Sequence, residues 1–137
     1  MDGEVTKTMD KKIMIVDDEP DILTSLRIVF EHQNYEVITV NSGFDCINEV
    51  EKGFKGIILM DIMMPEIDGW ETIQEIVNRG LIKNVAIEII TGKGTKDHQN
   101  MSALGSYVYD YLSKPLDMNE LISSVKKCDT FLAARNN

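Results

Sequence analysis

The chain has 137 residues, of which 43% are hydrophobic, and its 14 basic and 23 acidic residues give a formal net charge of −9. This length suits one domain with one core, and the acidic balance disfavours binding to nucleic acids or to anionic membrane surfaces. Its apolar runs are shorter than the roughly 20 residues of a membrane span, and the polar residues 1–12 lack the apolar stretch of a secretory signal, so we expect a cytoplasmic protein.

Short apolar runs alternate five times with longer amphipathic stretches along the chain. This pattern is typical of a parallel sheet that is covered by helices on both faces, so it predicts an α/β fold of the (βα)5 type. The five predicted strands are residues 12–17, 35–40, 56–61, 85–91 and 107–112.

Chemical signals mark the starts of the first three predicted helices. Pro20 suits the first turn of the first helix, because its missing N–H has no partner there in any case. Ser42 can cap the second helix. Asp68 and Glu71 have capping-box spacing, which predicts the start of the third.

The last two helices complete the domain. The segment between Gly92 and Gly105 is mostly polar, so we expect the fourth helix to be short. Asp117 with Glu120 predicts the start of the fifth helix by the same spacing as before. We therefore expect one domain over residues 12–133, with a flexible tail over residues 1–11 and a second tail over residues 134–137.

Polar side chains follow the ends of four predicted strands. Asp17 and Asp18 end the first strand, Asp61 ends the third, Thr91 ends the fourth, and Lys114 follows the fifth. In parallel α/β sheets, functional residues gather at the carboxyl ends of the strands. The sequence therefore predicts one site at this edge of the sheet.

The chemistry of these residues indicates a cation and a phosphoryl group. Three neighbouring carboxylates repel one another by about 1–4 kcal/mol per pair at near-surface dielectric, so the cluster calls for a bound cation. Hard carboxylate oxygens suit Mg²⁺. A lysine and a threonine hydroxyl beside it can hold phosphoryl oxygens, so the set is typical of phosphoryl transfer to a carboxylate.

Four segments carry a specific set of motifs, namely IMIVDDEPDI at 13–22, IILMDIMMPEIDGWE at 57–71, ITG at 90–92 and DYLSKPL at 110–116. With them the chain resembles the receiver domain of two-component response regulators, in the stand-alone, chemotaxis-type form, from residue 12 to residue 132. The resemblance implies a flavodoxin-like three-layer sandwich with a parallel sheet of order 2-1-3-4-5. It also implies that the first and fifth helices cover one face and the other three helices cover the opposite face.

The same resemblance implies the phosphoryl and metal chemistry of the site. Asp61 matches the aspartate that accepts a phosphoryl group from a sensor histidine kinase. Asp18 and Asp61 match direct Mg²⁺ ligands, Asp17 matches one that acts through water, and the backbone carbonyl of Met63 matches a further ligand.

Three more residues match the family's switching set. Thr91 matches the hydroxyl that moves onto the phosphoryl oxygen, and Lys114 matches the lysine that pairs with that group. Tyr111 matches the aromatic residue that turns inward when the threonine moves. A cis bond between Lys114 and Pro115 is also implied.

The function implied is a phosphorylation-driven switch and not an enzyme, because the only reactions are phosphorylation and dephosphorylation of Asp61 itself. The surface formed by the fourth helix, fifth strand and fifth helix would then bind a downstream effector protein. We expect a monomer, with a dimer of the phosphorylated chain as an alternative. The chain is also compatible with a fragment of a longer regulator.

Two other functions remain as alternatives. A phosphorylation-independent scaffold could keep the fold without the switch, although it has no reason to hold three acids together. A phosphatase similar to haloacid dehalogenases also uses a strand-end aspartate, Mg²⁺, threonine and lysine. That family needs a second acid two positions after the nucleophile, where this chain has Met63.

Several residues inside the predicted sheet and helices carry expectations of their own. Glu88 falls on a strand that should be covered on both faces, so we expect it to point toward the fourth helix and to reach water or a lysine. Cys46 and Cys128 should lie on opposite faces of the sheet, where they cannot pair.

Three tyrosines, Tyr107, Tyr109 and Tyr111, alternate along the fifth predicted strand. Since successive strand residues point to opposite faces, alternate ones should share a face, here the face toward the fourth helix. Ordinary packing on an edge strand explains them, and anchoring of a partner by Tyr107 or Tyr109 is the alternative.

Overall fold

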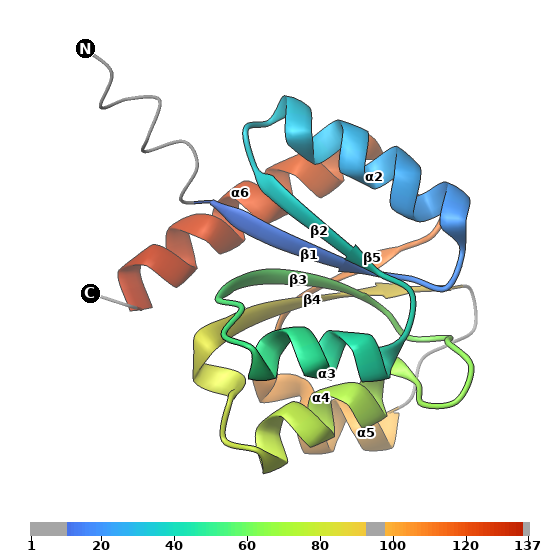
Figure 1. Ribbon diagram of the computed structural model, residues 1–137, viewed down its shortest axis with the longest axis vertical. Helices are drawn as coiled ribbons and strands as arrows, with labels where there is room; N and C mark the ends of the chain where they lie inside the picture. Colours follow the sequence, from blue (N-terminus) through green and yellow to red (C-terminus); the bar gives the residue numbers. More distant parts are fainter. Residues whose placement is uncertain (1–10, 93–97, 136–137) are drawn as a thin grey trace.

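In the computed structural model, which describes residues 11–92 and 98–135, five parallel strands form one sheet of order β2-β1-β3-β4-β5 (Figure 1). The strands are β1 (Lys12–Val16), β2 (Glu36–Val40), β3 (Gly56–Asp61), β4 (Val85–Thr91) and β5 (Val108–Ser113). The helices are α2 (Pro20–His32), α3 (Gly43–Glu51), α4 (Gly69–Asn78), α5 (His98–Leu104) and α6 (Met118–Arg135), with short 3₁₀ turns η1 (Ile82–Asn84) and η2 (Gly105–Tyr107). The predicted flavodoxin-like (βα)5 fold and its strand order are confirmed.

Most of the two predicted tails, residues 1–10 and 136–137, lies outside the described residues. The described helix α6 continues to Arg135, past the predicted domain end at residue 133, and the Arg135 guanidinium donates to the carbonyls of Lys83 (3.1 Å) and Val85 (2.9 Å). Across the described residues, no helix combines the length and the apolar character needed to cross a membrane.

The helices cover the sheet in two layers, with α3, α4 and α5 on one face and α2 and α6 on the other, as the resemblance implied (Figure 1). Alternation along each strand supplies both layers: in β1, Met14 and Val16 join the core under α3, α4 and α5, whereas Ile13 and Ile15 join the core under α2 and α6. Both faces of the central strands are therefore covered by apolar side chains that exclude water, and the predicted site residues Asp17 and Asp61 lie at the ends of their strands.

The predicted start of α2 is confirmed by Pro20 in its first turn, and those of α3 and α4 are confirmed by their hydrogen bonds. Ser42 Oγ accepts the Asp45 N–H at 3.1 Å. Asp68 and Glu71 form a complete capping box, in which each side chain accepts the other residue's backbone N–H, at 2.8 and 2.9 Å. This box fixes the start of α4 a few residues after Asp61, at the edge of the sheet where the site is predicted.

Glu88 does not point where the sequence indicated. Ala86, Glu88 and Ile90 share the face of β4 toward α6, because alternation along the strand places Ile87 and Ile89 toward α4 and α5. The Glu88 side chain is fully buried, and its carboxylate oxygens each lie 3.2 Å from the Ser124 hydroxyl of α6. The expectation of a position toward the fourth helix with water or a lysine was therefore wrong.

The tyrosines do not share one face either, because a bulge interrupts the pairing of β4 with β5. Tyr107 lies in η2 before the strand. Tyr109 packs on Phe131 of α6, with ring centroids 5.1 Å apart, whereas Tyr111 packs on Trp70 of α4 at 6.3 Å. The extra residue at the bulge reverses the alternation, which the sequence pattern did not reveal.

The two cysteines are free and buried in the separate cores on the two faces of the sheet. Cys46 lies on the buried face of α3, and Cys128 lies on the buried face of α6. The prediction that they cannot pair is confirmed.

Close packing of α4 against the end of β3 gives the first testable prediction. A methyl group added at Gly69 would lie 2.8 Å from the Asp61 carbonyl oxygen and 3.0 Å from the Ile62 Cα, and neither backbone atom can move cheaply. Gly69→Ala should lower the free energy of unfolding in urea by about 1–3 kcal/mol. Gly105→Ala is the matched control, because its methyl would meet only the Tyr111 hydroxyl at 3.4 Å. Equal stability of the two variants would contradict the prediction.

Candidate functional site

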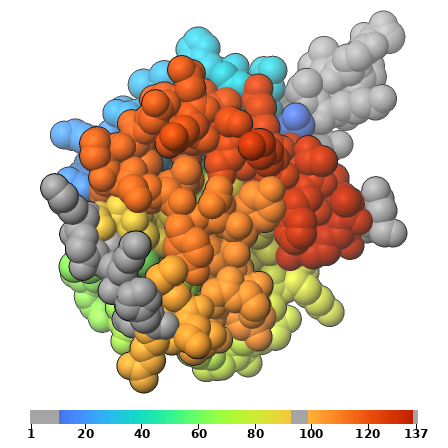
Figure 2. Space-filling view, turned by 180° about the vertical axis from the view of Figure 1, so that it is seen from behind, coloured from blue at the N-terminus to red at the C-terminus, as the bar shows by residue number. Residues whose placement is uncertain are grey.

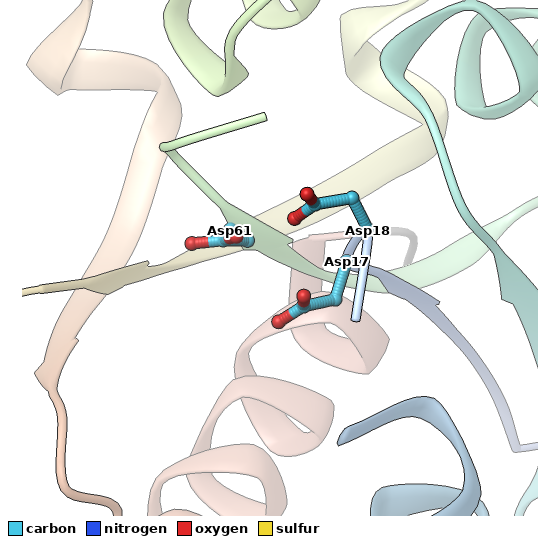
Figure 3. A group of neighbouring side chains, drawn as sticks. All are labelled: Asp17, Asp18 and Asp61. Atoms are coloured by element: carbon cyan, nitrogen blue, oxygen red, sulfur yellow. The ribbon is translucent and has the colours of Figure 1, made fainter. Parts of the chain in front are cut away.

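Three aspartates meet at the carboxyl edge of the sheet. Asp17 and Asp18 follow β1, and Asp61 ends β3, which pairs directly with β1. Figure 3 shows the three side chains together, and one carboxylate oxygen from each lies within 4.8 Å of the others. The structure thus brings together the three predicted acids.

The three acids differ in exposure. Asp17 and Asp61 are 1% and 3% exposed, whereas Asp18 is open to solvent. Asp17 Oδ1 accepts the Glu19 N–H at 2.9 Å, while its Oδ2 is buried and has no hydrogen-bond partner among the described residues. A buried carboxylate oxygen without such a partner is costly, so this atom favours a nearby positive charge.

Lys114 supplies one such charge. Its Nζ lies 3.7 Å from Asp17 Oδ2, 3.7 Å from Asp61 Oδ1 and 3.6 Å from Glu19 Oε1. The Lys114 N–H donates to the Thr91 carbonyl at 2.9 Å, and the bond between Lys114 and Pro115 is cis, as the resemblance implied. Burial alone would lower the pKa of Lys114, but the charges of Asp61, Asp17 and Glu19 raise it, so the ammonium form is favoured.

The carboxyl groups remain under-compensated in spite of this lysine. Burial raises the pKa of Asp61 to about 6, and the Asp17 charge adds to that rise, while Lys114 and the N–H of Met63 oppose it. Burial likewise raises the pKa of Asp17. One ammonium group therefore does not balance the acids that surround it.

The donor set fits a small divalent cation. Its oxygens belong to carboxylates, which Mg²⁺ prefers, and they come from two rigid strand ends. The partnerless Asp17 Oδ2 is the kind of atom that a cation or a water bound to it would satisfy. Asp17, Asp18 and Asp61 are the residues that would hold the ion. The backbone N–H of Met63 lies close enough to the Asp61 carboxylate to lower its pKa.

Thr91 of β4 and Tyr111 of β5 come from the two strands that follow β3 in the sheet. Thr91 follows Ile90, the register partner of Asp61, and its hydroxyl donates to the Leu112 carbonyl at 3.4 Å. Tyr111 is half-buried against Trp70 in the first turn of α4. The Thr91 hydroxyl is thus hydrogen-bonded to β5, and the Tyr111 ring packs on α4.

Two neighbours of the site were missed by the sequence analysis. Glu19 shares Lys114 with the aspartates, and its position directly after Asp17 and Asp18 was a usable signal. Trp70 is buried, and its indole N–H has no hydrogen-bond partner in the described part of the chain. Its ring packs on that of Tyr111, and a contact between elements so far apart in the sequence cannot be predicted from a local pattern.

Comparisons with known proteins agree with this geometry. A family model described as the response regulator receiver domain matches residues 13–126. The response regulator SaeR of Staphylococcus aureus (strain USA300) is 34% identical over 110 residues, which are 80% of this chain and 46% of SaeR. The chain thus spans about half the length of the curated relatives it matches.

Solved structures are similar as well. A CheY-like receiver domain protein of Methanospirillum hungatei JF-1 is 36% identical, with a TM-score of 0.85, and the match covers 93% of this chain and 98% of that one. The response regulator TrrA of Thermotoga maritima, solved with Mg²⁺ and BeF, is 28% identical with a TM-score of 0.72, covering 86% of this chain and 98% of TrrA.

Burial of Asp61, together with charge repulsion from Asp17, predicts that Asp61→Asn stabilises the chain when no divalent cation is present. The folded pKa of about 6 lies above the ordinary 3.8, so stability from this group is complete at low pH and is lost as the pH rises through about 6. With allowance for solvent screening, urea unfolding should show a gain on the order of 1–2 kcal/mol at pH 8.

The gain should shrink as the pH is lowered to 5, where part of Asp61 is already protonated in the folded chain. Glu36→Gln, which removes an exposed carboxylate at the start of β2, is the control and should change stability little at either pH. A variant Asp61→Asn that is less stable than the native chain at pH 8 would contradict this account.

Proposed function

This chain belongs to the response regulator receiver domains, which are signalling domains of two-component systems, and we propose that it is a phosphorylation-driven switch whose acceptor is Asp61. The observation that carries the proposal is the buried Asp61 carboxylate, held within 3.7 Å of the Lys114 ammonium and next to two further aspartates. No other group of acids and lysine in the described residues combines these features.

The proposed reaction transfers a phosphoryl group from a phosphohistidine of a sensor histidine kinase. An Asp61 carboxylate oxygen attacks phosphorus, a new O–P bond forms, and the N–P bond of the histidine breaks, so the electron pair of that bond stays on the imidazole. Attack by water later releases phosphate and restores the carboxylate. A bound Mg²⁺ supplies positive charge that offsets the charge gathered on the phosphoryl oxygens.

The protein groups around Asp61 have separate proposed roles. Asp17 and Asp18 hold the cation together with Asp61, and the Met63 carbonyl is a further proposed ligand. The Lys114 ammonium, already 3.7 Å from Asp61 Oδ1, pairs with a phosphoryl oxygen on that atom. The Thr91 hydroxyl then exchanges the Leu112 carbonyl for a phosphoryl oxygen, a better acceptor because it is charged.

Output is proposed to come from the face formed by α5, β5 and α6, which lie side by side in Figure 2. Movement of Thr91 changes the end of β4, to which β5 is hydrogen-bonded, and Tyr111 on β5 follows by changing its packing on Trp70. The charge on Asp61 thereby shifts an existing equilibrium of this face toward a form that binds an effector protein. We place this function in the cytoplasm and in a chain that is monomeric before phosphorylation.

A phosphatase function gains no support from the site. The residue two positions after Asp61 is Met63, an exposed apolar side chain that can give no proton to a leaving group. Asp61 therefore lacks the neighbouring acid that turnover of phosphate esters would need.

Intact-mass measurement tests the proposed function. The chain is incubated with a small acyl-phosphate donor, with and without Mg²⁺, and compared with Asp61→Asn. We expect the mass of one phosphoryl group to appear only in the native chain and only with Mg²⁺.

Asp18→Asn is a second variant, because it keeps Asp61 but removes a proposed cation ligand, so its labelling should need more Mg²⁺. Equal labelling of the native chain and Asp61→Asn would overturn the choice of acceptor. Absence of labelling in a chain that is folded by circular dichroism, even with a purified histidine kinase as donor, would favour the scaffold function.

A further inference from the structure

A second group of acids lies away from the phosphoryl site, between the sheet and α6. Glu88 of β4 is fully buried, and both of its carboxylate oxygens lie 3.2 Å from Ser124 Oγ on α6. The same Ser124 oxygen lies 2.9 Å from Asp110 Oδ2 on β5. One hydroxyl therefore joins two carboxyl groups that come from neighbouring strands.

When both acids are ionised, this group has one hydrogen atom too few to give each carboxyl group a hydrogen bond to Ser124. A serine hydroxyl has a single hydrogen, so it can donate to Glu88 or to Asp110 but not to both. With both acids ionised, two negative groups would share one hydrogen, and one of them, Glu88, has no contact with solvent. With one added proton, Glu88 donates to Ser124 Oγ and Ser124 donates to Asp110, so each of the two carboxyl groups is joined to Ser124 by a hydrogen bond.

The surroundings decide which acid carries that proton. Asp110 is exposed, and its Oδ1 accepts the Tyr111 N–H at 2.9 Å, so its charged form is solvated and hydrogen-bonded. Glu88 has no solvent contact, and its strand neighbour on β3 is the apolar Leu59. The proton therefore belongs on Glu88.

Other titratable groups near Glu88 do not replace this proton. From α6, the Cys128 thiol lies close enough to Glu88 to affect its pKa. From β5, Tyr109 lies close enough to feel its charge, as does Tyr35, which precedes β2. None of the described groups that act on Glu88 is a cation.

We propose that Glu88, when protonated, links α6 to β4 and β5 through Ser124, and that loss of this proton to water loosens the contact between α6 and these two strands, which we call the seam. Burial raises the pKa of Glu88 to about 7; the Ser124 hydrogen bond opposes the rise, and the Asp110 charge adds to it. Because this value lies above the ordinary 4.5, the stability from Glu88 is complete at low pH and is lost as the pH rises through about 7. The seam joins two elements of the proposed output face, but the proposal itself does not depend on phosphorylation.

Carbon-detected NMR of the unphosphorylated chain tests the proposal directly. The Glu88 side-chain carboxyl carbon, assigned by its loss in Glu88→Gln, should titrate with a midpoint close to 7. Asp110→Asn removes the charge that accepts the Ser124 hydrogen, so it should lower that midpoint by about one pH unit or more. A midpoint near 4.5 in the native chain, or no shift in Asp110→Asn, would overturn the proposal.

The role of Ser124 as the link is tested by repeating the comparison in a Ser124→Ala background. If the hydroxyl relays the interaction, Asp110→Asn should there shift the Glu88 midpoint by much less. An equal shift in both backgrounds would mean that Asp110 acts only through space. Should Ser124→Ala not fold, Ser124→Cys, which keeps a weak donor, provides an intermediate variant for the same comparison.

Loosening of the seam has its own readout in amide hydrogen exchange of α6. After correction for the intrinsic rate, the amides of Leu121 and Val125 should exchange up to about tenfold faster at pH 8 than at pH 6 in the native chain. Glu88→Gln keeps an N–H donor for Ser124 and carries no charge, so its exchange should not change. The same acceleration in Glu88→Gln would show that Glu88 does not control the seam.

Discussion

Two buried carboxylates at the ends of adjacent central strands are the constraint on which the site depends. Because β1 lies next to β3 in the sheet, Asp17 and Asp61 cannot separate without breaking strand pairing. Water is excluded from both, and Lys114 is the cation that the described structure places between them. The fold thereby holds two carboxylates so close together that a bound cation or an added proton is needed to reduce their repulsion.

The carboxyl ends of the strands also connect the charge on Asp61 to β5, the strand at one side of the sheet. Asp61 is in register with Ile90, the residue before Thr91, and the Thr91 hydroxyl and carbonyl bond to Leu112 and Lys114. Lys114 is thus held by β4 while it pairs with the acids of β1 and β3. A change of charge on Asp61 acts on groups from four strands, as the proposed switch requires.

Glu88 is a second buried carboxyl group in the same fold, and its charge is proposed to be balanced by a proton. It lies on β4 three residues before Thr91, but its side chain faces α6 and not the carboxylate cluster. The two acidic groups are therefore separate: one calls for a metal cation at the strand ends, and the other calls for a proton under α6. Both follow from burial of carboxyl groups on a sheet whose two faces are dry.

Local chemistry explains which features could be predicted from the sequence. The apolar runs, the Asp68 capping box and the clustering of Asp17, Asp18 and Asp61 depend on short segments and on a general rule for parallel sheets, so they could be predicted. The direction of Tyr109 could not, because it depends on a bulge in the pairing of β4 with β5. The Ser124 partner of Glu88 could not be predicted either, since it belongs to a helix 36 residues away.

The most direct test of the account is the free energy of unfolding as a function of Mg²⁺ concentration at pH 7.5, with ionic strength held constant. If the aspartates form a cation site, the native chain should gain about 1.4 kcal/mol for each tenfold rise in Mg²⁺ above the dissociation constant. Asp61→Asn should gain clearly less at the same concentrations. An equal gain in both chains, or no dependence on Mg²⁺ in the native chain, would contradict the claim that these buried carboxylates are built to receive positive charge.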